Sequence, residues 1–159
     1  MKPVRAILLV IGVLLVLADI AGARGVRVWS YQELLEKSDL VVISSPIATT
    51  DTKEHVDLPG FVGEHVIGVD TTFVVSAVLK GDKSKTNVVL HHYRTSDGTN
   101  IPHVPNGPSF VAFPTAEKAT VVPRAYILFL VRETDGRYAP AVGQTDPGLA
   151  VKELVGVAR

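Results

Sequence analysis

The sequence predicts a small, mainly β domain: a barrel of five to six antiparallel strands, preceded by one short helix and an N-terminal signal peptide. A chain of 159 residues is long enough for one domain. Short runs that are continuously apolar, or that alternate between apolar and polar residues, are separated by turns rich in glycine and proline. No helical pattern lies between successive runs, which argues against the parallel sheets of βαβ folds.

The first 23 residues have the three parts of a secretory signal peptide. Lys2 and Arg5 provide a basic start, residues 6–18 form an uncharged apolar run, and Ala21-Gly22-Ala23 ends the segment with small residues. We expect cleavage after Ala23, which leaves residues 24–159 as a single β-barrel domain. A retained membrane anchor is the alternative, but the 13 residues of the run span only about 20 Å as a helix, against a hydrocarbon core of about 30 Å. The sequence therefore predicts a secreted or periplasmic protein with no stable membrane span after cleavage.

A short helix is predicted near the start of the mature chain. Ser30 can accept a hydrogen bond from the backbone of Glu33, whose side chain can return one to Ser30 as a capping box. Trp29 and Leu34 occupy the two positions of a hydrophobic staple. The helix should extend from residue 31 to residue 37 or 38, and it is too short to be stable without packing on a larger core.

The strands are expected in order along the rest of the chain. Residues 40–43 form a continuous apolar run, and residues 67–79 alternate over the longest stretch. The further strands are expected at residues 87–93, 109–113, 126–131 and 138–142, with a hairpin turn at 133–136. Residues 49–60 and 95–108 should be loops, and residues 149–157 could form a strand or a helical turn. This pattern suits a small, partly open Greek-key barrel of the OB type.

Three segments carry a family resemblance. They are Ser38–Ile43 after the short helix, Val78–Gly81 at the end of the long strand, and Tyr126–Leu130 before Asp135-Gly136-Arg137-Tyr138. In this order they resemble small bacterial secreted domains of uncharacterised function, OB-type barrels similar to the netrin-like domain and to the tissue inhibitors of metalloproteinases. The resemblance covers most of residues 30–143. It implies a fold and an envelope location, and it carries no catalytic residues.

The composition excludes several classes of function. The chain has no cysteine, so disulfides, thiolate metal sites, a catalytic thiol and the cysteine-based zinc chelation of the metalloproteinase inhibitors are excluded. It has 16 basic and 16 acidic residues and 6% aromatic residues, whereas a nucleic-acid groove needs positive charge and aromatic platforms. We therefore expect no nucleic-acid ligand. Phosphate-loop, dinucleotide, zinc-protease and nucleophile-elbow motifs are missing from the sequence, so we expect no cofactor and favour a binding function over an enzymatic one.

A strand with two adjacent histidines is the main candidate for ligand binding. On a strand, His91 and Tyr93 share one face while His92 and Arg94 share the other. The predicted ligand-binding residues, at the mouth of the barrel, are His91, Tyr93, Arg94, Asp97 and His103. An envelope protein, a peptide or a glycan is the expected partner. The structural alternative is a histidine at the edge of the core that makes one hydrogen bond.

Metal binding is the second hypothesis. His55 lies in the motif Glu54-His55-x-Asp57, and His65 follows Glu64, so imidazole and carboxylate groups could meet around a zinc ion if the intervening segment folds back. The spacing between His55 and His65 matches no established ligand pattern. The working hypothesis is thus a non-catalytic binding module, with a metal-binding protein or metal-dependent enzyme using a histidine cluster as the alternative. The sequence does not predict the oligomeric state.

Overall fold

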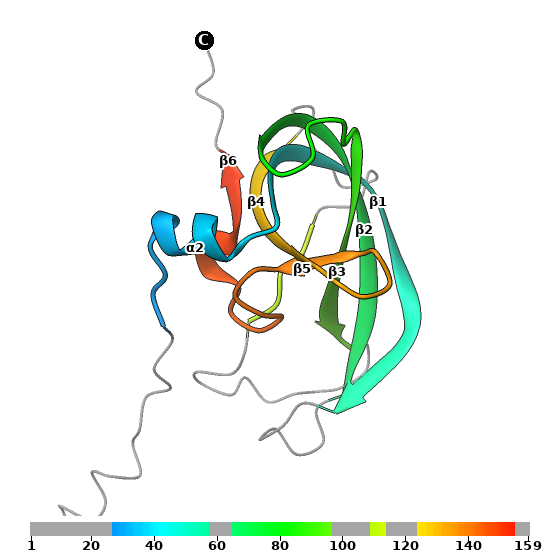
Figure 1. The fold of residues 1–159 in the computed structure, drawn as a ribbon. Coiled ribbons are helices and arrows are strands. Elements are labelled where there is room, and N and C mark those ends of the chain that lie inside the picture. The colour runs from blue at the N-terminus through cyan, green and yellow to red at the C-terminus, as the bar shows by residue number, and fades with distance from the viewer. Residues whose placement is uncertain (1–26, 58–64, 97–108, 114–123, 155–159) are drawn as a thin grey trace, which may run out of the picture.

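The structure, a computed structural model, describes residues 27–57, 65–96, 109–113 and 124–154. The elements follow one another as α2 (Tyr31–Lys37), β1 (Leu40–Asp57), β2 (His65–Lys80), β3 (Asn87–Thr95), β4 (Ala125–Arg132), β5 (Tyr138–Pro140), the 3₁₀ turn η2 (Gly148–Ala150) and β6 (Val151–Leu154) (Figure 1). The signal peptide predicted at residues 1–23 lies outside the described residues, as do Asp97 and His103. No helix in the described ranges is long and apolar enough to cross a membrane.

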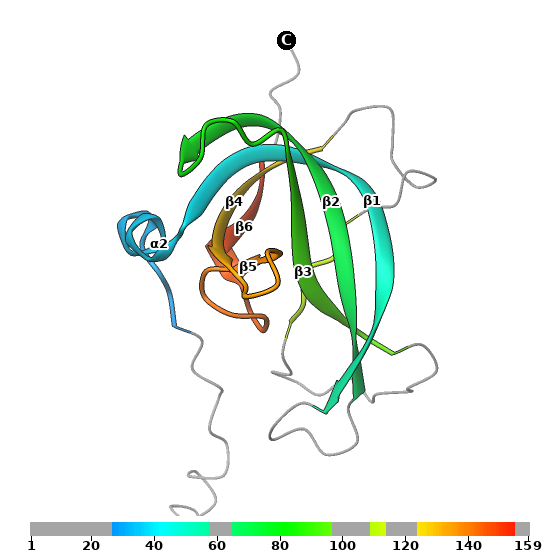
Figure 2. The same ribbon diagram turned by 45° about the vertical axis from the view of Figure 1, so that its right-hand side comes forward.

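The strands close into a five-stranded barrel with one further strand on its outside. Their order is β1-β2-β3-β5-β4-β6, and β1 also pairs with β4, which joins the two sides of the sheet (Figure 2). Residues Leu40–Ser44 of β1 lie antiparallel to Tyr126–Leu130 of β4. The predicted mainly β barrel preceded by one short helix is confirmed. One pair, β3 with β5, is parallel and meets at Leu90 and Tyr138, so the sheet is mixed rather than wholly antiparallel.

The core lies inside this barrel. Alternation along β2 buries Val69, Thr71 and Phe73, as the sequence pattern predicts. Phe73 is fully buried, and the edge of its ring meets Phe113 at a centroid distance of 4.9 Å. The residues of the main cluster are Leu40, Val42, Phe73, Val88, Leu90, Tyr126, Leu128, Leu130 and Tyr138. Burial of this set is the main stabilising contribution to the barrel.

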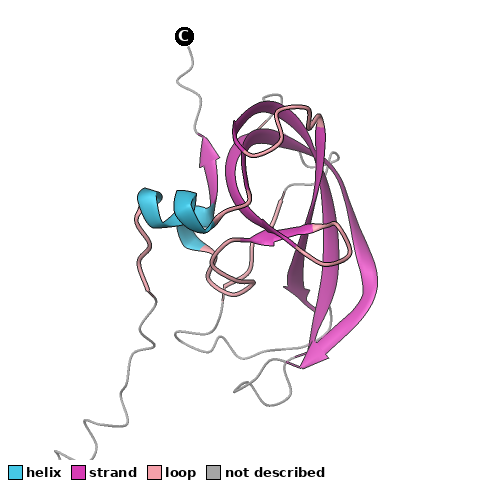
Figure 3. Cartoon of the chain, in the orientation of Figure 1, coloured by secondary structure: helices cyan, strands magenta, loops and turns pink. Residues whose placement is uncertain are grey.

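Helix α2 covers a second, smaller cluster at one side of the barrel (Figure 3). The predicted helix and its capping box are confirmed: Ser30 accepts from the Glu33 backbone N–H, and the Glu33 side chain accepts from the Ser30 N–H. Leu34 is fully buried against Val41 and Phe129. The packing supplies the stability that a seven-residue helix lacks by itself.

The expected loop at residues 49–60 is wrong over most of its length, because β1 extends to Asp57. Residues 48–57 pair antiparallel with β2 from Thr72 to His65. The polarity of the segment favours a loop, but three of its residues are threonines, which favour strands. It projects beyond the packed core, so its polarity reflects exposure to solvent and not a lack of regular structure.

Three smaller predictions have mixed outcomes. Residues 109–113 form no strand; Phe113 instead packs against the rings of Phe73, His92 and Tyr126. The hairpin at residues 133–136 is confirmed, with β5 ending at Pro140 and not at residue 142. The C-terminal segment contains both predicted alternatives in succession, the turn η2 and then strand β6.

Candidate functional site

A polar cluster covers the outer face of the sheet, on the side opposite the barrel core. Alternation along β2 and β3 directs Phe73 and Leu90 inward, so Asp70, His91 and Tyr93 belong to the outer face. Asp70 lies directly opposite His91 in the register of these strands. Together with side chains from β1 and from the turn between β4 and β5, they form what we call the outer-face cluster: Glu54, Asp70, His91, Tyr93, Glu133 and Arg137.

Glu54 reaches this cluster because β1 bulges over Gly68. Between the pairs Asp51–Val69 and His55–Ile67, three residues of β1 stand opposite the single residue Gly68. A Cβ atom on residue 68 would lie 2.5 Å from Thr52 Oγ1, closer than real Cβ atoms approach a neighbour, and 3.0 Å from Glu54 Cβ, a tight contact. A side chain at residue 68 would therefore force β1 to shift, and glycine leaves room for Glu54 over β2. A bulge opposite a strand glycine is a common device for re-aiming a side chain.

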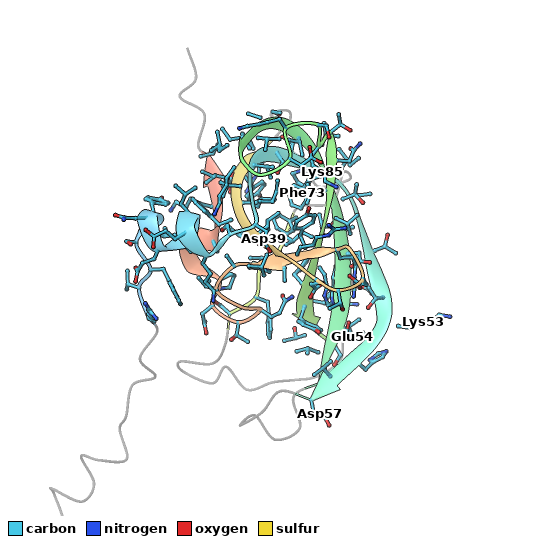
Figure 4. The ribbon with its side chains drawn as sticks, in the orientation of Figure 1. Asp39, Lys53, Glu54, Asp57, Phe73 and Lys85 are labelled. Atoms are coloured by element: carbon cyan, nitrogen blue, oxygen red, sulfur yellow. The ribbon has the colours of Figure 1, made fainter. Side chains whose placement is uncertain are left out.

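The Glu54 carboxylate contacts two residues of β3. The Tyr93 hydroxyl donates a short hydrogen bond to Oε1. The other oxygen, Oε2, lies 3.1 Å from His91 Nε2, outside the alignment of a hydrogen bond. Burial, and then the hydrogen bond to Glu54, raise the pKa of Tyr93, so its hydroxyl remains a donor at neutral pH. In Figure 4, Glu54 lies on the part of β1 that extends past the core residue Phe73.

His91 lies between two carboxylates and is almost completely buried, with 3% of its surface exposed. Its Nδ1 lies 2.9 and 3.1 Å from the two carboxylate oxygens of Glu133. A carboxylate only accepts hydrogen bonds, so in the neutral ring the proton sits on Nδ1. The edge of the ring meets Tyr93 at a centroid distance of 5.1 Å. His91 therefore joins the turn after β4 to the bulge of β1.

Arg137 clamps the same turn to β2. Its Nη1 donates to Asp70 Oδ1 at 2.9 Å, and its Nε donates to Asp135 Oδ2 at 2.7 Å. The Arg137 backbone N–H and guanidinium hold the pKa of Asp135 below its usual range. Gly136 adopts a φ of +94°, which lets the chain turn within four residues. The turn between β4 and β5 is thus fixed over β3.

The second histidine, His92, points into the barrel. It is 3% exposed, and its Nε2 lies 2.8 Å from Thr71 Oγ1, which in turn lies 3.0 Å from Thr49 Oγ1. The Phe113 ring meets it edge-on at 5.3 Å. Burial lowers the pKa of His92 to about 4. His92 is therefore a neutral core residue at physiological pH.

The structure brings together some of the predicted ligand-binding residues and separates others. His91 and Tyr93 meet in the outer-face cluster. Arg94 lies on the opposite face of β3, where its Nε and Nη2 form a two-pronged contact with Asp51 at 2.9 and 2.6 Å. The other two predicted members, Asp97 and His103, fall in ranges for which the structure gives no description.

The predicted metal-binding histidines are placed by strand pairing. His55 is exposed on β1 opposite Ile67, and His65 begins β2 opposite Asp57. In the described part of the chain, no three histidine, aspartate or glutamate side chains form a group able to hold a metal ion. His91 contacts two carboxylates, but they lie at opposite nitrogens of its ring.

Sequence reasoning missed three members of the cluster, Asp70, Glu133 and Arg137, and placed the fourth, Glu54, in the predicted metal motif with His55. Two signals pointed toward them. Gly68 and Asp70 interrupt the outer face of an otherwise apolar and threonine-rich strand. A glycine inside a strand often marks a close approach of another chain segment, which here is the bulge of β1.

Comparison with known proteins adds no relative. No protein-family model matches the sequence, and no curated protein or solved structure matches it either. The function is therefore inferred from the geometry of the outer face.

Proposed function

We propose that this chain is a secreted or periplasmic, non-catalytic binding module whose outer-face cluster receives a basic segment of an envelope protein or peptide. The observation that carries the proposal is the bulge that holds Glu54 over Gly68, in contact with Tyr93 and close to His91. It is accompanied by a glycine in the middle of a strand, and such a glycine by itself weakens a sheet. Such an arrangement is costly for a surface without a role, and bulges of this kind are concentrated near functional sites.

The charge of the face selects the ligand class. Glu54, Asp70, Glu133 and Asp135 contribute four carboxylates. The Arg137 guanidinium pairs closely with Asp70 and Asp135 and lies 3.9 Å from Glu133. The four acidic side chains are 28 to 48% exposed, so each has acceptor capacity left for a ligand. A surplus of acceptors favours a ligand rich in donors, and lysine and arginine side chains provide both donors and positive charge. Phosphate groups of nucleic acid would be repelled by the same face.

The contacts inside the cluster favour binding over catalysis. Acid–base catalysis needs a group that is free to exchange a proton with a substrate. The Tyr93 hydroxyl donates to Glu54, and its raised pKa makes it a poor nucleophile. The two ring nitrogens of His91 face Glu133 and Glu54. These groups hold one another in place, which produces a preformed surface.

The face of the sheet is a better docking surface than its edge. Within the described ranges, residues 45–57 of β1 pair with β2 and with no strand on their other side. That edge carries Pro46, the exposed Lys53 and two interruptions of the register. Proline, lysine and bulges are the features by which natural sheets prevent a foreign strand from adding to an edge. A partner is therefore expected to contact side chains on the face.

The location of this module is proposed from the N-terminal segment. The signal peptide expected at residues 1–23 supports export, and the likeness to OB-type, netrin-like secreted domains supports an envelope role. Proteins of the OB type bind ligands on the face of strands 2 and 3 and with the loop between strands 4 and 5. In this barrel His91 and Tyr93 lie on β3 and Glu133 lies in the turn between β4 and β5, an arrangement that supports the proposal.

The test compares two double variants of the full chain, each carrying a C-terminal tag. Glu54→Gln with Glu133→Gln removes two carboxylates from the cluster. Glu36→Gln with Glu153→Gln removes two carboxylates from α2 and β6, away from it. Each protein is used to capture partners from native envelope extract, with and without a chelator, and the captured partner is titrated at low and high salt.

We expect the wild type and the α2–β6 variant to capture the same partner, and the cluster variant to bind it at least tenfold more weakly. Affinity should fall as salt rises, because exposed charges are screened. Equal binding by the three proteins, or no captured partner, would contradict the proposal. A partner lost on chelation would favour the metal-dependent alternative.

A further inference from the structure

One ring nitrogen of His91 is buried without a hydrogen-bond partner, although a carboxylate oxygen lies beside it. Nδ1 lies 2.9 and 3.1 Å from the carboxylate oxygens of Glu133, and Nε2 lies 3.1 Å from Glu54 Oε2. The residue is 3% exposed, and in the described part of the chain Nε2 makes no hydrogen bond. Buried polar atoms without a partner are few in native structures. The ring thus stands between two carboxylates and uses only one of them.

The number of protons on the ring decides whether the contact with Glu54 is favourable. The neutral ring has one N–H, which Glu133 accepts, so Nε2 turns a lone pair toward Glu54 and two acceptors face each other. The charged ring has an N–H on each nitrogen and can donate to both carboxylates at once. The Glu54 side chain is 36% exposed, so its carboxylate has room to turn into line with Nε2.

The charged and titratable groups around His91 come from each element packed against its outer side. They are Glu54 of β1, Asp70 of β2, Tyr93 of β3, and Glu133, Asp135 and Arg137 of the turn between β4 and β5. The loop after β5 adds the uncharged Gln144, which donates to the His91 carbonyl oxygen at 3.0 Å. Carboxylates beside a histidine stabilise its charged form and burial opposes it. Histidine is also the side chain whose charge ordinarily changes between pH 5 and 8.

We propose that His91 is a proton-operated clasp of the outer-face cluster. With a second proton the ring donates to both Glu133 and Glu54, and it ties the turn between β4 and β5 to the bulge of β1. Without that proton the ring releases the Glu54 carboxylate, which can then accept from a cationic side chain of a ligand. The clasp is a property of the chain by itself, whereas its effect on a basic ligand rests on the proposed function.

The direction of the pH effect follows from competition for the same carboxylate. A basic ligand and the charged ring both need Glu54, so binding of the ligand displaces a proton from His91. By linkage, the affinity for the ligand rises with pH as His91 loses that proton. Other groups do not interfere between pH 5.5 and pH 8. This range lies above the ordinary range of carboxyl groups, and burial lowers the pKa of the neighbouring His92 to about 4.

Urea denaturation of the full chain at pH 5.5 and pH 8 tests the clasp without a ligand. Glu54→Gln keeps an acceptor for the Tyr93 hydroxyl and removes the charge that faces Nε2. His91→Asn keeps an amide donor close to the position of Nδ1 and cannot become charged. We expect Glu54→Gln to lower the urea midpoint more at pH 5.5 than at pH 8 when His91 is present, and by the same amount at both pH values in His91→Asn. An effect of Glu54→Gln that does not depend on pH, or that keeps its pH dependence without His91, would overturn the proposal.

Binding of a short peptide of alternating lysine and serine tests the effect of the clasp on a ligand. Wild type, His91→Asn and a control, His55→Gln on the exposed part of β1, are titrated with this peptide at pH 5.5 and pH 8 and constant ionic strength. We expect wild type and control to bind the peptide about tenfold more weakly at pH 5.5 than at pH 8. His91→Asn should bind it equally at the two pH values.

The two measurements separate this inference from the proposed function. Binding of the peptide by the wild type with equal affinity at both pH values, or an unchanged pH dependence in His91→Asn, would overturn the inference and leave the proposed function standing. Absence of binding at either pH would contradict the proposed function, and the urea midpoints would then decide the clasp. If His91→Asn does not fold, the ring nitrogens of His91 are observed by NMR in the wild type. A proton on Nε2 should be present at pH 5.5 and absent at pH 8, and an unchanged proton count would overturn the proposal.

Discussion

The buried histidine His92 makes the stability of the barrel depend on pH in a way that can be calculated. Its pKa is about 4 in the folded protein and about 6.5 in an unfolded chain. Between these values the unfolded chain binds a proton that the folded protein does not. The contribution of neutral His92 to the free energy of unfolding is therefore present above pH 6.5 and is lost as pH falls toward 4.

The magnitude follows from this difference. A shift of one pKa unit corresponds to about 1.4 kcal/mol, so the full effect of His92 is about 3 kcal/mol. Between pH 7 and pH 4.5 the loss is about 2.4 kcal/mol, because the change is not yet complete at pH 4.5. That loss is a large fraction of the 5 to 15 kcal/mol, roughly, that stabilises a typical domain.

The assay is urea denaturation followed by circular dichroism at several pH values from 7 to 4.5. His92→Phe removes the titrating group, leaves Thr71 its contact with Thr49, and keeps an aromatic ring beside Phe113. Between pH 7 and pH 4.5 we expect the free energy of unfolding of this variant to fall by about 2.4 kcal/mol less than that of the wild type. A control, His55→Gln on the exposed part of β1, should keep the wild-type dependence. Equal dependence in the wild type and His92→Phe would refute the reasoning.

Three further substitutions test the fold by urea denaturation at neutral pH. Gly68→Ala should destabilise the protein by about 1 to 3 kcal/mol, because the new Cβ meets the bulge of β1; a loss below about 0.5 kcal/mol, the range of neutral surface changes, would mean that the bulge adapts. Ser30→Ala should cost about 1 kcal/mol by removing the capping box, and an unchanged midpoint would contradict that assignment. Phe73→Ala should cost about 3 to 5 kcal/mol in the core, whereas the exposed neighbour Val74→Ala should cost under about 1 kcal/mol; similar values would contradict the assignment of inner and outer faces.

Short-range patterns in the sequence were sufficient to predict the elements that depend on contacts between residues close in the chain. The capping box of Ser30 and Glu33 lies within four residues, and the helix has the predicted start. The turn at Asp135-Gly136 joins two strands that are neighbours in sequence. The alternation from Val69 to Phe73 likewise identifies the inner face of β2. In each case the residues that determine the structure are close together in the chain.

Contacts between distant segments could not be predicted in this way. The polar second half of β1 becomes a strand only because β2 supplies its hydrogen bonds. The cluster joins His91 to Glu133, 42 residues away, and Arg137 to Asp70, 67 residues away. No spacing rule relates such positions. His91 and Tyr93 could be placed on one face by alternation, but their carboxylate partners come from pairings that a single sequence does not reveal.

The central claim, that a partner contacts the outer face of β1, β2 and β3, is tested most directly by crosslinking in the native envelope. A photoreactive residue replaces Thr50, which is exposed on β1 opposite Asp70, or Lys152 on the external strand β6. We expect one specific adduct from position 50, which the substitutions Glu54→Gln and Glu133→Gln together weaken. We expect no adduct of that mass from position 152. An adduct from position 152 and not from position 50 would contradict the claim.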